Sequence, residues 1–110
     1  MVISFSIPEA RTQLMTKGTV ATFRWNRRKH IGRDWAQVKR GTEKIADVEI
    51  KEVGCFETIP DLVPYLSLSG FETIRDWRRA IVSTSKPSDY LRHCGWLYLV
   101  TRVEAKKEAQ

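Results

Sequence analysis

The sequence predicts an α+β fold built on a curved, largely antiparallel sheet. Two helical patterns, one near the N-terminus and one past the middle of the chain, enclose three strand-like segments, and the strongest strand signal comes last. Helices and strands therefore do not alternate strictly, as they would in a doubly wound α/β fold. A chain of 110 residues can bury one independent core, so we expect a single domain over residues 1–104 and a polar tail at 105–110.

A short helix is expected from Ile7 to Thr16. Ser6 and Glu9 have the spacing of a capping box, and Pro8 between them suits a first helical turn. Gly18 can end the helix in a left-handed turn, because glycine adopts that conformation at little cost.

The next two segments are predicted strands. Residues 19–25 are rich in β-branched and aromatic side chains, and their alternation places Thr22 and Arg24 on one face and Trp25 on the other. Residues 34–39 follow as a second strand that ends at an Arg-Gly turn.

The second half of the chain predicts a strand, a helix and a final strand. Residues 46–51 alternate apolar and charged side chains, which indicates a strand with one solvated face. Apolar residues at three- and four-residue intervals over 71–81 predict a core-facing helix, with Arg78 inside its apolar arc. The Arg78 head either reaches solvent or projects into a ligand cavity. A loop is expected at 86–89, and bulky apolar groups on both faces of 95–103 predict a central strand.

A segment without acidic residues, from Ala10 to Arg33, is the main functional signal. In its densest part cations alternate with aromatic rings, and such groups can hold phosphates and stack on bases. The candidate RNA- or phosphate-binding residues are Arg24, Arg27, Arg28, Lys29, Arg33 and Arg78. The candidate cleft or stacking residues are Thr22, Trp25 and His30. A protein of net charge +6 must also expose cations somewhere, so composition alone leaves a plain solvated loop open.

Other classes of site are not indicated by the sequence. Cys55 and Cys94 belong to no C-x-x-C pair, so we expect two buried free thiols, with no metal and no cofactor. The motifs of phosphate loops, dinucleotide sites, zinc proteases and serine hydrolases do not occur. Without a basic leader or a long apolar run, a soluble, monomeric, cytoplasmic protein with no membrane association is expected. The scarcity of Asn and Gln is compatible with a thermophilic source.

Residues 17–24, Lys-Gly-Thr-Val-Ala-Thr-Phe-Arg, resemble the start of the ASCH domain, a member of the PUA-like superfamily found in small archaeal and bacterial proteins. That family usually shows a pattern like G-x-K-T-x-T-x-R after a short first helix. The likeness continues at residues 69–71, where the family often has Glu-Gly-Phe, and at 96–103, its closing strand. The resemblance implies a small open β-barrel of mostly antiparallel strands with flanking helices. It also implies a cleft where the first strand meets the second helix.

The roles known or proposed in that family are RNA binding, ribonuclease action and hydrolysis of acetylated cytidine by Lys, Thr and Glu. Aligning Arg24 with the motif's arginine places Thr22 on the family threonine, but Thr19 on the lysine and Ser69 on the glutamate. Both proton-handling groups are then missing. The resemblance therefore implies an RNA- or nucleotide-binding module that performs no chemistry.

Three alternatives remain open from the sequence. An amidohydrolase would use Thr22, with Lys17 or Glu72 replacing the missing groups after a shift of the backbone. A ribonuclease would use His30, kept neutral by the surrounding cations, as a general base toward the 2′-hydroxyl. A third possibility is an interaction module for an acidic protein partner.

Overall fold

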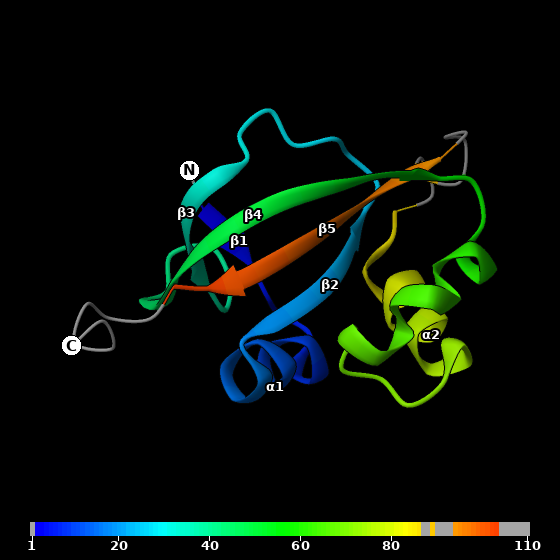
Figure 1. Ribbon diagram of the computed structural model, residues 1–110, viewed down its shortest axis with the longest axis horizontal. Coiled ribbons are helices and arrows are strands. Elements are labelled where there is room, and N and C mark those ends of the chain that lie inside the picture. The colour runs from blue at the N-terminus through cyan, green and yellow to red at the C-terminus, as the bar shows by residue number, and fades with distance from the viewer. Residues whose placement is uncertain (1, 87–88, 90–93, 104–110) are drawn as a thin grey trace.

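The computed structural model describes residues 2–86, 89 and 94–103, and in it a five-stranded mixed sheet curls into a half-barrel flanked by helices (Figure 1). The predicted α+β class is therefore confirmed. In chain order the elements are β1 (Val2–Ser4), α1 (Pro8–Lys17), β2 (Thr19–Arg24), β3 (Gly32–Gln37), β4 (Lys44–Phe56), the 3-10 helix η1 (Ile59–Leu68), α2 (Ile74–Thr84) and β5 (Gly95–Arg102).

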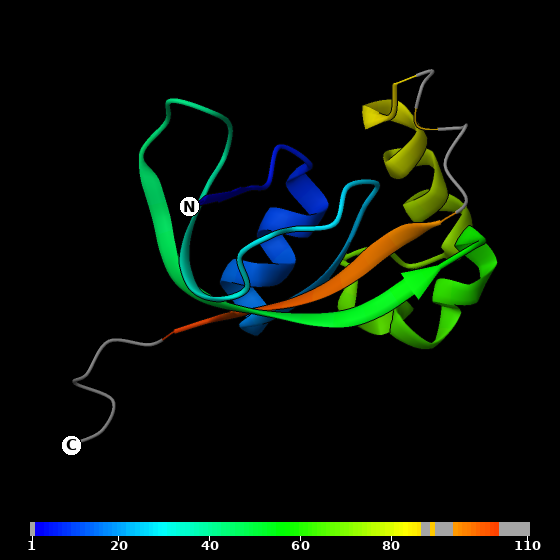
Figure 2. The same cartoon turned by 90° about the horizontal axis from the view of Figure 1, so that it is seen from above.

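The strands lie in the order β1-β3-β4-β5-β2. The short N-terminal strand β1, which the sequence did not predict, pairs parallel with β3, and the other neighbours are antiparallel. Seen from above, the sheet curls, and η1 and α2 gather at one end of it (Figure 2). Because β2 is an edge strand, the side of β2 away from β5 is open to ligands or to neighbouring helices.

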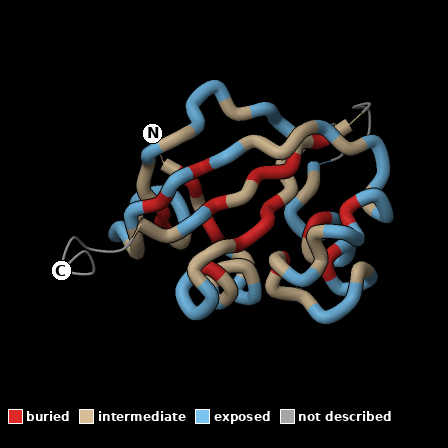
Figure 3. Tube along the Cα trace, in the orientation of Figure 1, coloured by how far each residue is buried: buried red, intermediate tan, exposed pale blue. Residues whose placement is uncertain are grey.

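Both faces of β2 and β5 are buried, so the protein has two hydrophobic cores. Val20 and Ala21, which are adjacent on β2, belong to different cores, as do Leu97 and Tyr98 on β5. Buried stretches run along these strands in Figure 3. The first core lies with α1, β1 and β3, and the second lies beneath η1 and α2. The predicted central position of the last strand is confirmed.

Helix α1 is displaced by one residue from its predicted bounds. Gly18 ends it as expected, with φ 87° and an N–H bond to the Leu14 carbonyl at 3.0 Å. The predicted capping box is wrong, because Ile7 is the N-cap residue and no side chain caps the helix. Pro8, which follows, has no N–H to satisfy, so a cap is needed less.

Strand β4 is longer than the 46–51 segment predicted for it. Its register shifts between Glu52 and Gly54, and beyond this irregularity the apolar–charged alternation stops, which is why the sequence pattern ended early. Strand β3 begins at Gly32 and ends at Gln37, two residues before the predicted bounds at each end.

The expectation of two buried thiols is wrong. Cys55 is exposed and Cys94 is half-buried. Phe56, the neighbour of Cys55, packs on the second core, so alternation along the strand turns Cys55 to the opposite, solvated side. Geometry thus overrides the tendency of a free thiol to be buried.

The helical region combines η1, which contains Pro60 and Pro64, with α2. The Thr73 hydroxyl caps α2 by accepting the Asp76 N–H at 3.1 Å. The predicted core-facing helix is confirmed, since Trp77 is buried in it, but it runs over Ile74–Thr84 instead of 71–81 because the Thr73 cap sets its start. The predicted loop lies partly, and the polar tail 105–110 wholly, outside the described residues.

Candidate functional site

A pocket of about 130 Å³ opens beside β2, between the start of α1 and helix α2. Three regions distant in sequence form its wall: the turn from β1 to α1, the strand β2, and the segment from the end of η1 through α2. Representative lining residues are Ser4, Phe5, Thr22, Arg24, Phe71 and Trp77. Of the described residues that line this pocket, Arg24 alone has an ionisable side chain.

Arg24 is held by hydrogen bonds that use only part of its guanidinium. Nε donates to Thr22 Oγ1 at 3.1 Å, and Nη2 donates to the Ser4 carbonyl oxygen at 2.8 Å. The guanidinium carbon also lies 5.5 Å from the centre of the Phe5 ring, a cation–π contact. A guanidinium has more N–H groups than these two bonds employ, so donors remain for a ligand.

The charge on Arg24 is not neutralised by the residues around it. Burial and, after it, the neighbouring charge of Arg28 lower the pKa of Arg24 from its ordinary value to about 10. No carboxylate in the described part of the chain forms an ion pair with it. Arg24 stays protonated at neutral pH, and an anion or carbonyl oxygen in the pocket would stabilise that state.

Strand β2 also offers an unpaired backbone edge to this pocket. The Arg102 N–H donates to the Gly18 carbonyl at 2.7 Å, so in this antiparallel pair every second residue of β2, counted from Gly18, directs its backbone N–H and C=O toward β5. By alternation, the N–H and C=O groups of Thr19, Ala21 and Phe23 point to the open side. The side-chain amide of Gln13, on α1, donates a hydrogen bond to the Thr19 carbonyl at 3.1 Å. Over residues 2–86, 89 and 94–103, nothing pairs with the backbone groups of Ala21 and Phe23.

A wider groove of about 540 Å³ adjoins the pocket and is called here the basic groove. It shares Phe23, Arg24 and Thr84 with the pocket. Residues 25–30, which include five of the predicted ligand-binding cations and rings, form most of its wall. A ligand could therefore enter the pocket and extend along the basic groove.

Arg28, one of the predicted phosphate ligands, is engaged by the protein itself. Its Nη2 lies 3.2 Å from Asp34 Oδ2, with only 16% of the Arg28 and 6% of the Asp34 side chain exposed. Its backbone N–H donates to the Tyr98 hydroxyl at 2.6 Å. These contacts hold the loop to the sheet and leave little of the Arg28 charge for a ligand.

Arg27 is also paired, although it is more exposed. Two 3.0 Å hydrogen bonds join its Nε and Nη2 to the Glu52 carboxylate, and its guanidinium lies 4.5 Å from the centre of the Trp96 ring. The hydrogen bonds with Glu52 raise the pKa of Arg27. A phosphate would have to compete with this carboxylate.

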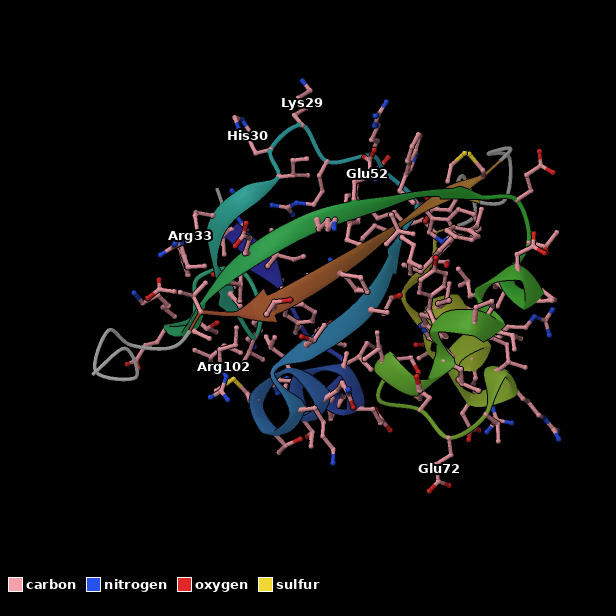
Figure 4. All side chains as sticks on the ribbon, in the orientation of Figure 1. Lys29, His30, Arg33, Glu52, Glu72 and Arg102 are labelled. Atoms are coloured by element: carbon pink, nitrogen blue, oxygen red, sulfur yellow. The ribbon has the colours of Figure 1, made fainter. Side chains whose placement is uncertain are left out.

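Lys29, His30 and Arg33 are the predicted contact residues whose side chains remain open to a ligand. All three are exposed and project from the loop and from β3 (Figure 4). Within the part of the chain that the structure describes, their side chains form no hydrogen bond or ion pair. Lys29 and His30 also line the basic groove.

Trp25 combines the two roles that the sequence left open. Its Nε1 donates to Ser85 Oγ at 2.8 Å, and its ring packs edge-on against Phe23 at 5.1 Å. It is therefore fixed against the second core, while part of it lines the basic groove. A base can stack only on the part of the ring that faces the groove.

The remaining sequence candidates lie as follows. Thr22 is buried, lines the pocket and accepts the Arg24 hydrogen bond. Arg78 is exposed on α2 and lies in the wall of neither the pocket nor the basic groove. Thr19 pairs with the Thr101 hydroxyl at 3.3 Å. Ser69 is buried beside the pocket, and its hydroxyl accepts the Phe71 N–H at 3.0 Å.

Sequence reasoning missed the contribution of the β1–α1 turn. Ser4 supplies a carbonyl and Phe5 a ring to Arg24, although no local signal marks either residue as functional. The parallel pairing of β1 with β3 brings them there. The backbone edge of β2 was also missed, because edge position depends on strand order and not on composition.

Comparison of the chain with protein-family models, with curated proteins and with solved structures finds no match. Among the described residues, no three His, Cys, Asp or Glu side chains are grouped closely enough to hold a metal ion. No helix in the described ranges has both the length and the apolar character to cross a membrane.

Proposed function

We propose that the protein binds RNA or a nucleotide-like ligand by placing one base in the Arg24 pocket. Arg24 carries this proposal, since it keeps free N–H donors and lacks a carboxylate partner among the described residues. A cavity of about 150 Å³ accommodates a benzene ring. The pocket of about 130 Å³ is thus close in size to one six-membered ring.

The polar groups of the pocket suit the edge of a base. The N–H and C=O of Ala21 and of Phe23 offer donors and acceptors side by side, and Arg24 adds a charged donor next to them. Apolar walls that include Phe71 and Trp77 would cover the faces of the ring. Few polar groups in an apolar pocket are typical of small-ligand sites.

The phosphates of such a ligand would lie along the basic groove. Lys29 and His30 are exposed on its wall, and Arg33 follows at the start of β3. Single-stranded or looped RNA is favoured, because only unpaired bases can leave the strand and enter a pocket.

The resemblance to the ASCH domain supports this proposal. Arg24 and Thr22, at motif positions, both line the pocket, and the pocket lies between the motif strand and α2. The curled sheet is compatible with a PUA-like barrel, which we propose as the finer description of the half-barrel.

Binding is favoured over hydrolysis by the composition of the pocket wall. Among its described residues only Arg24 has an ionisable side chain, and an arginine with pKa about 10 is a poor general base at neutral pH. Thr19 and Ser69 occupy the family's lysine and glutamate positions. The Thr19 hydroxyl is hydrogen-bonded to the Thr101 hydroxyl, and the Ser69 hydroxyl accepts the Phe71 N–H.

The test is a comparison of two arginine variants in RNA binding. Arg24→Gln should weaken binding of a short mixed-sequence single-stranded RNA by roughly 10- to 100-fold, the loss of a charged hydrogen bond. Arg40→Gln, which removes the same charge from the exposed turn after β3, should bind nearly as the parent does. Fluorescence anisotropy at fixed salt measures both, and thermal unfolding verifies that each variant is folded.

Equal affinity of folded Arg24→Gln and parent protein would refute the pocket as the binding site. The same samples, with acetylated cytidine added, are examined for products by chromatography. Product formation that Thr22→Ala abolishes would replace binding by amidohydrolysis, and RNA cleavage that His30→Ala abolishes would replace it by ribonuclease action. Salt-sensitive capture of an acidic protein without any preference for RNA would indicate the protein-interaction role.

A further inference from the structure

Cys55 and Cys94 lie together where β4 ends and β5 begins. Cys55 is directly opposite Trp96 in the sheet, and Cys94 precedes Trp96 by two residues, so both cysteines face the same side of the sheet as diagonal neighbours. The register therefore brings two cysteines that are distant in sequence close together. The influence of the Cys55 thiol, through a hydrogen bond, raises the pKa of Cys94.

Both thiols can also be reached by reagents. Cys55 is exposed and Cys94 is half-buried. Diagonal neighbours have Cα atoms roughly 7–8 Å apart, which exceeds the usual span of a disulfide, so closure requires the chain to shift where β4 ends and β5 begins. Proximity and access to solvent make the two thiols candidates for oxidation.

We propose that Cys55 and Cys94 form a reversible redox site that closes as an intramolecular disulfide when the protein meets a peroxide or a low-molecular-weight disulfide. This proposal does not depend on RNA or nucleotide binding. It rests on the register of β4 and β5 and on the exposure of the thiols.

The reaction with a low-molecular-weight disulfide begins at Cys55, because Cys55 is exposed whereas Cys94 is half-buried. The Cys55 thiolate attacks one sulfur of the reagent, forms a mixed disulfide and releases one reagent thiolate. Cys94, after losing its proton to solvent, attacks Cys55 Sγ and releases the second thiolate. Two protein thiols are oxidised while one reagent disulfide is reduced to two thiols.

A peroxide leads to the same product. The Cys55 thiolate attacks one oxygen, the O–O bond breaks, and Cys55 becomes a sulfenic acid as water is formed. Cys94 then attacks Cys55 Sγ and displaces a second water. The peroxide accepts the two electrons in this sequence.

Closure of the disulfide would constrain the helical region. The ring of about 40 residues between the two cysteines contains η1, α2 and the segment between them, from which Phe71 and Trp77 line the pocket. Fewer conformations of the unfolded chain would be available, so the oxidised protein should unfold at a higher temperature.

The test treats the folded parent protein with a small excess of oxidised glutathione or hydrogen peroxide. Mass spectrometry should show the loss of two hydrogen atoms, a Cys55–Cys94 cross-linked peptide, and no thiol left for alkylation. The unfolding temperature should rise on the order of 10 °C or more, and a reducing agent should reverse the rise.

Cys55→Ser and Cys94→Ser serve as separate controls, since each keeps one thiol. Neither should gain the reversible thermal shift. The proposal is overturned if the parent retains two alkylatable thiols after treatment while free cysteine in the same solution is oxidised. It is equally overturned if the cross-link forms only between two chains, as non-reducing electrophoresis would reveal.

Discussion

The cations of the basic segment differ in what surrounds each side chain. Arg28 and Asp34 form a largely buried pair, and removing one partner from such a pair costs about 3–5 kcal/mol. Arg27 and Glu52 form a more exposed pair, of a kind that contributes little to stability because water screens it. The sequence makes these arginines look equivalent, but Arg28 stabilises the fold, whereas Arg24 has no ion-pair partner among the described residues.

The lowered pKa of Arg24 predicts a pH dependence of binding. The guanidinium is protonated below pH about 10 and loses its proton above it, so affinity for an anionic ligand should be level from about pH 7 to 9 and fall near pH 10. The difference between the parent and Arg24→Gln isolates this effect from other titrating groups. Parallel pH curves for the two proteins would contradict the assignment.

The same shift has a consequence for stability. The unfolded chain keeps the Arg24 proton up to the higher, ordinary pKa of arginine, whereas the folded chain releases it near pH 10. Between these values the unfolded state binds more protons, so this group's contribution to folding improves as the pH rises through that window. At neutral pH the full cost of burying the charge is present, and a bound anion would relieve it.

At the level of elements, the position of β2 at the sheet edge creates the pocket. Its partner β5 occupies one side, and α1 and α2 approach the other without covering Ala21 and Phe23. Phe23 forms part of both the pocket and the basic groove. The placement of its ring depends on Gly95, the first residue of β5.

Replacement of Gly95 by alanine should displace the Phe23 ring. A Cβ atom added at Gly95 would overlap the Cζ atom of Phe23. Overpacking of this kind costs about 1–3 kcal/mol, so Gly95→Ala should lower the free energy of unfolding and weaken ligand binding. Denaturant unfolding measures the first effect.

The matched control for this prediction is the double variant Gly95→Ala with Phe23→Leu. A smaller, flexible side chain at position 23 relieves the overlap, so the two substitutions should cost less together than the sum of their separate costs. Strictly additive costs would show that the two residues do not interact.

At the scale of the whole molecule, the net charge is +6, but among the described residues only some of the cations are free of carboxylate partners and so can bind a polyanion. Arg27, Arg28 and Lys44 are bound to carboxylates, while Lys29 and Arg33 are not paired within the described part of the chain. A polyanion should therefore be held mainly by the second group. The contribution of Lys29 and Arg33 can be measured from the salt dependence of RNA affinity, which reports the counterions released on binding.

The double variant Lys29→Ala with Arg33→Ala should flatten the dependence of RNA affinity on salt. Each phosphate contact in a single strand contributes about 0.7 to the log–log slope, so the slope should decrease by about 1.4. Lys39→Ala with Arg40→Ala removes the same charge from the turn after β3 and should leave the slope nearly unchanged. Equal flattening in both variants would mean that net charge, and not this loop, holds the RNA.

The elements with strong periodic patterns could be predicted from the sequence. Trp77 in α2 and Leu97 in β5 are buried as the spacing of apolar residues indicated. Strand β1 and helix η1 were not predicted, since three residues give no period and Pro64 masks a helical pattern. The strand bulge near Gly54 likewise has no periodic signal, and with it the exposure of Cys55 was missed.

The candidate site was predictable only in part. Arg24 and Thr22 were proposed from the motif and do line the pocket, but Ser4 and Phe5 reach Arg24 only through the pairing of β1 with β3. Contacts between residues distant in sequence leave no local pattern.

The sequence by itself determined the α+β class, the principal helices and strands, and a stretch rich in cations. These features depend on side-chain periodicity and charge, which are local properties of the chain. Tertiary structure alone decided that β2 is an edge, that Arg28 pairs with Asp34 while Arg24 has no ion-pair partner among the described residues, and that two cysteines distant in sequence become neighbours. The reason is physical, because strand order and burial set each group's partners and thereby decide which charges and thiols remain available for chemistry.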